Sequence, residues 1–532
     1  MSPVPTPPVR PPDAPAAREG AGRRVRVALL LALVVAVVAH VRGAGEHPNN
    51  QDRELDLLLA RRIVAEGVWT DGCRSPLFPL CLAPVAGADA GFAQRARWVG
   101  LATGALAFAV VFLVLARLAS ERTALVAALA LGPEWTFQVS RLRGEPIAAA
   151  LVVLCAACLA TRRGAAHPLR AAFLAGAFAG ASHLAKGSGP LTLLAASAVV
   201  VVQDRRRAMA PVALLVAGFV LVAAPLLVDT ARRFGSPFFN ANTAHVMWEE
   251  AGEDQQWRWS TATPASWWAA HGLAGTLERL GRGLLVVTHG PVLWATLAAA
   301  AALRWARRRG GATTVPDGAA AFVGVTAAFV VAWLPPFAWY VPIANGRRYL
   351  FPVVAAAVPA LVLVLEAALR ARAARAAAAV DAVGARLLAV LASPVALVAA
   401  VVALVAADVV ESRSPPRPGP RVPFDEATLA VASRLRALPE GTRVLAGPSA
   451  TVPSPWLVHP AATYVHLPSG LPPAEAEAWV RGHADVVLWS RGLATRRPQP
   501  FSSWADGATP PWAVPASPAD ATGPLRLYRV VP

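Results

Sequence analysis

The chain has little charge and almost no lysine. Among its 50 basic residues only Lys186 is a lysine, and all the others are arginine. Charged residues make up 15% of the 532 positions, whereas hydrophobic residues make up 56%, and the mean hydropathy is +0.47. This balance excludes a soluble domain of this length. It is typical of a polytopic α-helical membrane protein, whose apolar runs approach the ~20 residues needed to cross a bilayer.

Cysteine is scarce as well, because the chain has only four, too few for a disulfide framework. Cys73 and Cys81 fall in one predicted extracytoplasmic loop, where a disulfide and two free thiols both remain open. Cys155 and Cys158 form a C-x-x-C pattern inside an apolar run. Since a redox or metal site would need polar neighbours that are missing there, we interpret this pair as small packing residues.

The positive charge follows the pattern of a membrane topology. The net charge is +18, but the arginines fall in short loops between apolar runs, which argues against a nucleic-acid partner. The positive-inside rule places the N-terminus in the cytoplasm. We predict an uncleaved first span rather than a signal peptide, because ten apolar runs follow it. The eleven predicted spans lie near 25–42, 98–116, 123–139, 146–161, 171–184, 189–203, 209–228, 284–303, 319–339, 349–369 and 386–407.

Three regions complete the predicted organisation. A proline-rich stretch, 1–22, predicts a disordered cytoplasmic tail. The transmembrane domain covers 23–408, with outward loops at 43–97 and 229–283. Residues 409–532 predict a small extracytoplasmic α/β domain. Its helix-like pieces are DEATLAVASRLRAL and PAEAEAWVRG, and its strand-like pieces are TRVLAG, ATYVHL, ADVVLWS and LRLYRVV. It has no Gly-rich phosphate loop, so we assign it no chemistry.

The first outward loop reads HPNNQDRELDLLLARRIVAEGVWTDGCRSPLFPLCLAP. Its apolar residues recur at helical spacing from Arg53 to Glu66, which predicts an amphipathic helix at the membrane surface. From pattern alone, Asp52 reads as the N-cap of that helix and Arg74 as an interfacial arginine. Lys186, at the outer end of the fifth span, could likewise reach a lipid head group. Functional roles for all three stay open at this point.

The second outward loop, 229–283, is rich in tryptophan, which is most often an interfacial belt, although stacking on a sugar is the alternative. We expect no metal site there, despite a group of four acidic residues: Glu249, Glu250, Glu253 and Asp254. His245, His271 and His289 are scattered along the chain, and no site is read into them.

The ordered motifs resemble those of the GT-C glycosyltransferases, membrane enzymes that include the protein O-mannosyltransferases and the lipid A aminoarabinose transferases. Their first loop reads D-E-x-x-Y-x-x-x-A-x-x-L-x-x-x-G, then a basic residue before a P-L-Y-P-like turn. Asp52 falls on this spacing, whereas Arg53 replaces the second acid and Asp56 the aromatic. The later matches are RSPLFP, SRLRGEPIAAALVVL, SHLAKGSGPL, FGSPFFNANTAHVMWEE and NGRRYLFPVVAAAVPAL, in family order over about 43–365.

The resemblance implies an inverting transfer of a sugar from a polyprenyl-phosphate-linked donor to a cell-envelope glycan, lipid or protein. Asp52 would then be the base or acceptor orienter, and Arg74, Lys186 and Arg348 would bind the carrier phosphate. Glu145 would bind sugar or pair with one of these cations. No cofactor or metal is implied. A transporter or lipid flippase is the alternative, although no internal repeat is visible. Arg53 also leaves open an inactive scaffold of the same fold.

Overall fold

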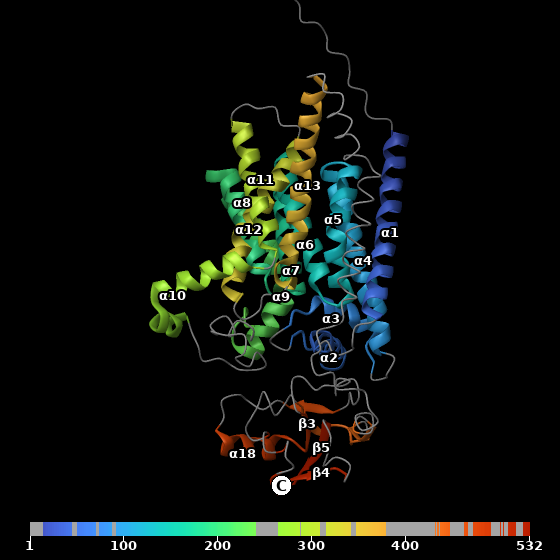
Figure 1. Ribbon diagram of the computed structural model, residues 1–532, viewed down its shortest axis with the longest axis vertical. Coiled ribbons are helices and arrows are strands. Elements are labelled where there is room, and N and C mark those ends of the chain that lie inside the picture. Colours follow the sequence, from blue (N-terminus) through green and yellow to red (C-terminus); the bar gives the residue numbers. More distant parts are fainter. Residues whose placement is uncertain are drawn as a thin grey trace, which may run out of the picture.

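The protein was analysed as a computed structural model. It describes residues 14–44, 51–70, 74–87, 92–240, 264–287, 289–308, 315–341 and 347–378, together with parts of the tail between 431 and 531. The long helices run roughly parallel in one bundle (Figure 1). The helices of this part are α1 (Ala14–Ala44), α2 (Gln51–Glu66), α3 (Leu77–Leu82), α4 (Phe92–Leu118), α5 (Glu121–Ser140), α6 (Glu145–Thr161), α7 (Pro168–Ala185), α8 (Gly189–Asp204), α9 (Met209–Phe234), α10 (Pro264–Val286), α11 (Gly290–Arg308), α12 (Asp317–Tyr340) and α13 (Arg347–Ala378).

The described helices are those of a multi-pass membrane protein. Six of them are long and apolar enough to cross a bilayer, within α1, α4, α6, α9, α12 and α13. The bent pair of α10 and α11 would make a seventh if it forms one span. The count of eleven spans and the sidedness of the termini stay predictions, and the last predicted span, 386–407, lies outside the described residues.

Two details of the helices were not expected from the sequence. Helix α1 begins at Ala14, within the proline-rich stretch 1–22, because the alanine-rich part of that stretch favours a helix. The limits and cytoplasmic location of the predicted tail stay predictions. The span predicted at 284–303 is not one helix, since α10 and α11 meet at an angle of 91°. Pro291 lacks an N–H donor and disfavours helical backbone before it. His289, at this break, has a φ of 66°.

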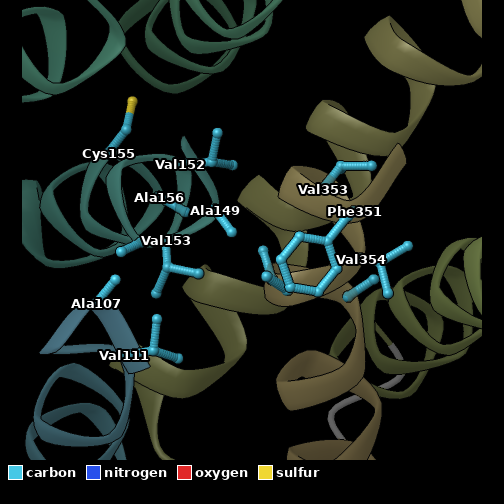
Figure 2. Packing of buried hydrophobic residues seen from close by; sticks show 14 of the residues in the cluster. Ala107, Val111, Ala149, Val152, Val153, Cys155, Ala156, Phe351, Val353 and Val354 are labelled. Atoms are coloured by element: carbon cyan, nitrogen blue, oxygen red, sulfur yellow. The ribbon is translucent and has the colours of Figure 1, made fainter. Parts of the chain in front are cut away.

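Helix α6 lies inside the bundle and contacts α4, α7, α8, α12 and α13. Figure 2 shows the ring of Phe351, on α13, directed toward the small side chains of Ala149 and Val153 on α6. Trp135, on α5, packs edge-on against Phe351 with a centroid distance of 5.3 Å. The Trp135 indole N–H donates to the Gly104 carbonyl at 2.9 Å, so this fully buried ring also has its hydrogen bond.

Helices α7 and α9 pack backbone to backbone through glycines. A Cβ atom on Gly176 would lie 1.9 Å from the Leu215 carbonyl oxygen, and one on Gly218 would lie 2.2 Å from the Phe173 carbonyl oxygen. Gly180 makes a similar approach to Phe219. Such small-residue interfaces let helices approach closely in a membrane, where van der Waals packing drives association.

The described part of the tail forms a five-stranded sheet in the order β2-β1-β3-β5-β4. Strand β1 pairs in parallel with β2 and β3, whereas β5 pairs antiparallel with β3 and β4. Four strands coincide with strand-like pieces of the sequence, but β4 was not expected. The elements are β1 (Arg443–Ala446), β2 (Thr463–Val465), α18 (Pro473–His483), β3 (Val486–Ser490), β4 (Ala513–Pro515) and β5 (Leu525–Val530).

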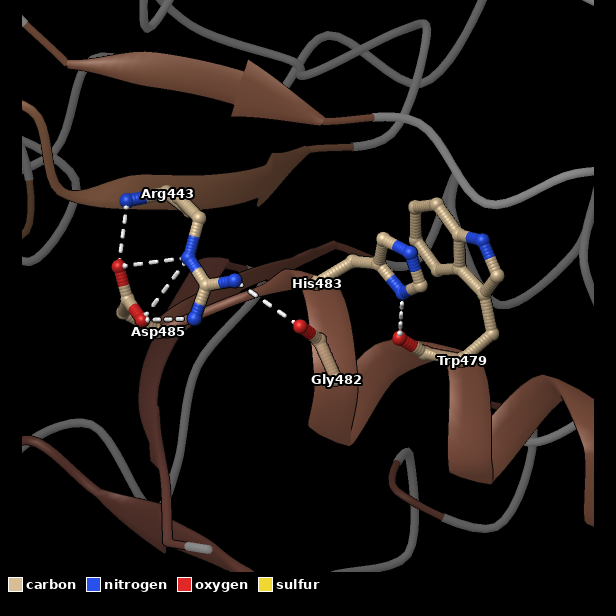
Figure 3. Close-up of polar contacts among 5 residues, drawn as sticks. All are labelled: Arg443, Trp479, Gly482, His483 and Asp485. Atoms are coloured by element: carbon tan, nitrogen blue, oxygen red, sulfur yellow. Dashed lines mark hydrogen bonds and ion pairs between the residues drawn. The ribbon is translucent and has the colours of Figure 1, made fainter.

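A polar cluster joins β1 of this sheet to the end of α18 (Figure 3). The Arg443 guanidinium donates to the Asp485 carboxylate at 2.6 Å and to the Gly482 carbonyl at 2.9 Å. Beside it, the rings of Trp479 and His483 stack with centroids 4.4 Å apart. These contacts fix the α18–β3 connection. The limits of the predicted domain and its extracytoplasmic location stay predictions.

Candidate active site

Three helix ends bring together Glu145, Lys186 and Arg348. Glu145 is the first residue of α6, Lys186 directly follows α7, and Arg348 is the second residue of α13. A carboxylate at a helix N-terminus and an ammonium at a C-terminus are both favoured by the helix dipole. Arg348 has the opposite preference, because a cation at a helix N-terminus is disfavoured by the dipole.

Lys186 and Glu145 form a buried ion pair. The ammonium donates to the Glu145 carboxylate at 2.8 Å, and their side chains are only 18% and 10% exposed. The same ammonium reaches the Arg348 carbonyl oxygen at 3.4 Å. Lys186 therefore ties the end of α7 to the beginnings of α6 and α13.

Positive charge exceeds negative charge around this pair. Arg143 and Arg348 both act electrostatically on Glu145 and on Lys186. Burial lowers the pKa of Lys186 and the two arginines lower it further, while the Glu145 carboxylate opposes them. Among these four side chains one is a carboxylate and three are cations, a composition that suits the binding of an anion.

Tyr349 lies between two of the cations. Its ring centroid is 5.3 Å from the Lys186 nitrogen and 4.8 Å from the Arg348 guanidinium carbon. The Arg348 guanidinium also donates to the Tyr349 hydroxyl at 2.8 Å. Tyr340 packs edge-on against Tyr349, with centroids 5.5 Å apart. The electron-rich face of an aromatic ring attracts cations, so Tyr349 contributes favourably to the placement of both.

The segment that follows Arg74 packs directly against this group. Gly144 precedes Glu145, and a Cβ atom there would lie 3.0 Å from the Ala185 carbonyl oxygen and 3.2 Å from the Phe78 side chain. Helix α3, which carries Phe78, thus meets the start of α6 and the end of α7 at a position where a glycine gives the needed space.

Arg74 itself is held within the first loop. Its guanidinium lies 3.8 Å from the Asp56 carboxylate of α2, and both side chains are largely buried. The Thr70 hydroxyl donates to the Arg74 carbonyl at 2.7 Å. The Trp69 backbone N–H donates to the Asp229 carboxylate of α9 at 3.2 Å. The loop is therefore anchored to the bundle rather than separate from it.

Asp52 lies in the first turn of α2, one turn before Asp56. The predicted helix from Arg53 to Glu66 thus exists, beginning two residues earlier. Whether Asp52 acts on a substrate stays a prediction. Cys73 lies outside the described residues, so neither the disulfide to Cys81 nor the two free thiols is tested.

Sequence reasoning missed two residues here. Arg143 stands two positions before Glu145 in SRLRGEP, and it was counted only as a loop charge. Asp56 stands where the resembling family has an aromatic residue, a departure that could have signalled a new partner for Arg74. Within the part of the chain that the structure describes, no group of three or more His, Cys, Asp or Glu side chains could hold a metal ion. The acidic group at 249–254 is outside that part.

The sequence matches no family model and no curated protein. Solved structures do match the fold. The crystal structure of ArnT from Cupriavidus metallidurans bound to undecaprenyl phosphate has a TM-score of 0.54 at 16% identity, covering 94% of this chain and 97% of that one. Its apo structure also has a TM-score of 0.54, with 96% and 98% covered. The chain shares the fold of these two structures.

The GT-C resemblance expected from the order of motifs is thereby confirmed for the fold. An oligosaccharyltransferase from Archaeoglobus fulgidus also matches, with a TM-score of 0.46 at 13% identity over 88% of this chain and 70% of that one. At 16% identity the likeness to ArnT shows the fold alone. Activity has to be argued from the residues of this chain.

Proposed function

We propose that this protein is an integral-membrane, inverting glycosyltransferase that moves a sugar from a polyprenyl-phosphate-linked donor to a cell-envelope acceptor. The observation that carries the proposal is the net positive group around Glu145 at converging helix ends. A lipid monophosphate suits such a group in charge and in its position at the end of a membrane bundle. The fold neighbour ArnT, crystallised with undecaprenyl phosphate, supports this class of ligand.

In the proposed reaction the acceptor oxygen forms a bond to C1 of the sugar while the bond from C1 to the phosphate oxygen breaks. The electron pair of that bond leaves with the carrier phosphate. Lys186 and Arg348 would hold the phosphate, joined by Arg74 from the first loop, because cations that meet developing negative charge stabilise the transition state. Asp52 would take the proton of the acceptor hydroxyl, and Glu145 would keep Lys186 in place or contact the sugar.

The proposed topology places this chemistry on the outer face. The arginine-rich loops keep the N-terminus in the cytoplasm, and the group around Glu145 then faces outward with the first loop. The tail with its β-sheet would also be extracytoplasmic, where it could meet the acceptor. Both hexosyl and pentosyl transfer are compatible with the charge of the site.

The test is direct binding of undecaprenyl monophosphate to purified protein. We expect Lys186→Met to weaken this binding about 10- to 100-fold, since a charge-assisted hydrogen bond is worth about 1.5–3 kcal/mol. Arg206→Met is a matched control, because Arg206 is exposed and follows α8 at the opposite end from Lys186. Equal affinity of the wild type and Lys186→Met would contradict the assignment of the cations.

A further inference from the structure

A second polar group lies inside the bundle, apart from the cations. Glu134 is on α5, two turns before the outer end of that helix, and its carboxylate accepts a hydrogen bond from the Gln138 amide at 2.7 Å. The His289 ring nitrogen Nε2 lies 3.9 Å from the same carboxylate. An ionisable group at membrane depth is costly and is usually kept for function.

The geometry between Glu134 and His289 suits a bridging hydroxyl group. A separation of 3.9 Å is longer than a hydrogen bond. An oxygen atom about 2.8 Å from each could donate to the carboxylate and accept from an imidazole N–H. The two side chains are each 16% exposed, so they are sheltered without being sealed.

Gln138, beside Glu134, has a side-chain oxygen that accepts no hydrogen bond in the described part of the chain. Its side chain is fully buried, and its Oε1 atom has no hydrogen-bond partner among the described residues. A buried carboxamide oxygen without a partner costs free energy. A ligand hydroxyl would satisfy it. Carboxylate, carboxamide and imidazole together provide donors and acceptors for several hydroxyls, as a sugar ring requires.

The backbone at His289 is also unusual. It has a φ of 66°, in the left-handed region that favours glycine, and it stands at the 91° break between α10 and α11. Strained residues of this kind cluster at functional sites. The bend between α10 and α11 leaves the His289 ring close to Glu134 of α5.

The group is linked to the cation site through the core. Trp135, next to Glu134, packs against Phe351, and Phe351 follows Tyr349 by two residues on α13. We propose that Glu134, Gln138 and His289 form a sugar-binding subsite that takes hydroxyl groups of a substrate sugar. This inference rests on the proposed function, and it adds residues to which the motifs gave no role.

The test compares bare and glycosylated carriers: undecaprenyl monophosphate, and undecaprenyl phosphate bearing mannose or arabinose, each titrated into purified full-length protein. We expect the wild type to prefer at least one glycosylated carrier, and Glu134→Gln to lose about 10-fold of that preference while its affinity for the bare carrier is unchanged. Glu366→Gln is the control, because Glu366 is a carboxylate near the opposite end of α13 from Arg348.

Two substitutions at His289 separate the ring from the strain. Asn tolerates a positive φ and keeps a polar side chain. Gly also adopts a positive φ without strain, but it has no side chain. We expect His289→Asn to keep more of the preference than His289→Gly. If Glu134→Gln keeps the preference but transfers less sugar from the labelled carrier into membranes, the bound sugar belongs to the acceptor. Preference and transfer both unchanged in Glu134→Gln would overturn the subsite.

A wild type that binds the bare and glycosylated carriers equally, together with unchanged transfer in Glu134→Gln, would also overturn it. These results are distinguishable from a failure of the proposed function itself. In that case the wild type would bind neither the bare nor the glycosylated carrier, and both proposals would fall together.

Discussion

Helix α6 carries a buried ion pair at each end, and the two differ in how their charge is balanced. At its start, Glu145 meets Lys186 within the field of Arg143 and Arg348. At its end, Arg162 is 3% exposed and donates to Asp204 at 2.7 Å and to Gln203 at 3.0 Å.

The second cation near Asp204, Arg163, is 62% exposed, so water screens it. At the end of α6 one buried cation thus meets one carboxylate, as in a structural tie between α6 and α8. At its start one carboxylate lies in the field of three cations in a sheltered position. Burial is common to both pairs, and the ratio of cations to carboxylates is what separates them; the ligand site proposed above is at the end with the higher ratio.

The largest expected effect is a loss of the proposed sugar transfer. Asp52→Asn should reduce sugar transfer about 10²- to 10⁴-fold, the usual contribution of a general base. The protein should keep its thermal stability, and binding of the carrier phosphate should be unchanged. The measurement is transfer from a labelled polyprenyl-phosphate sugar into membranes. Glu121→Gln, on the opposite side of the bundle, is a control with the same change of charge.

Transfer that persists in Asp52→Asn would remove this carboxylate from the mechanism. It would leave the group around Glu145 as a binding site with another base, or as part of a transporter or an inactive scaffold.

The second prediction concerns the structural end of α6. Arg162→Met should destabilise the protein by about 1.5–3 kcal/mol, because it removes charge-assisted hydrogen bonds and leaves Asp204 without its main partner. Undecaprenyl monophosphate should still bind the folded fraction with wild-type affinity. Thermal unfolding in detergent and lipid titration give the two readouts. If lipid affinity fell and stability did not, the roles of the two ends would be reversed.

The smallest effect is a dependence of stability on pH. The hydrogen bond from Arg162 lowers the pKa of Asp204 below its ordinary value. A lowered carboxyl pKa in the folded state stabilises the protein above the unfolded-state pKa, and this stabilisation disappears as pH falls through the folded-state pKa. We expect the melting temperature of the wild type to fall more steeply below about pH 4 than that of Arg162→Met. Parallel curves would show that the pair contributes nothing measurable.

The sequence allowed much of the site to be predicted, because its parts are local. Glu145, Lys186 and Arg348 each stand at the end of an apolar run, and apolar runs are read directly from hydropathy. Because successive spans cross the membrane in alternate directions, the three span ends that carry these residues are predicted to lie on the same side. Arg143 belongs to the same turn, but its approach to Lys186 depends on how α6 and α7 pack.

Other features could not be read from one-dimensional patterns. Glu134 and His289 are separated by more than one hundred residues, and they meet only because the chain bends by 91° at a position that hydropathy reads as continuous. Strand β4 has three residues and contains a proline at its end, so its signal is too short for strand alternation to reveal.

The glycine contacts between α7 and α9 have a mechanical consequence. With carbonyl oxygens seated where side chains would otherwise stand, neither helix can slide or rotate without a collision. Gly283 of α10 makes the same kind of contact, since a Cβ atom there would lie 1.8 Å from the Ala338 carbonyl oxygen of α12. Lys186, at the end of α7, is thus carried by a helix whose position relative to α9 is fixed by backbone contact, so its ammonium is held in place before any ligand arrives.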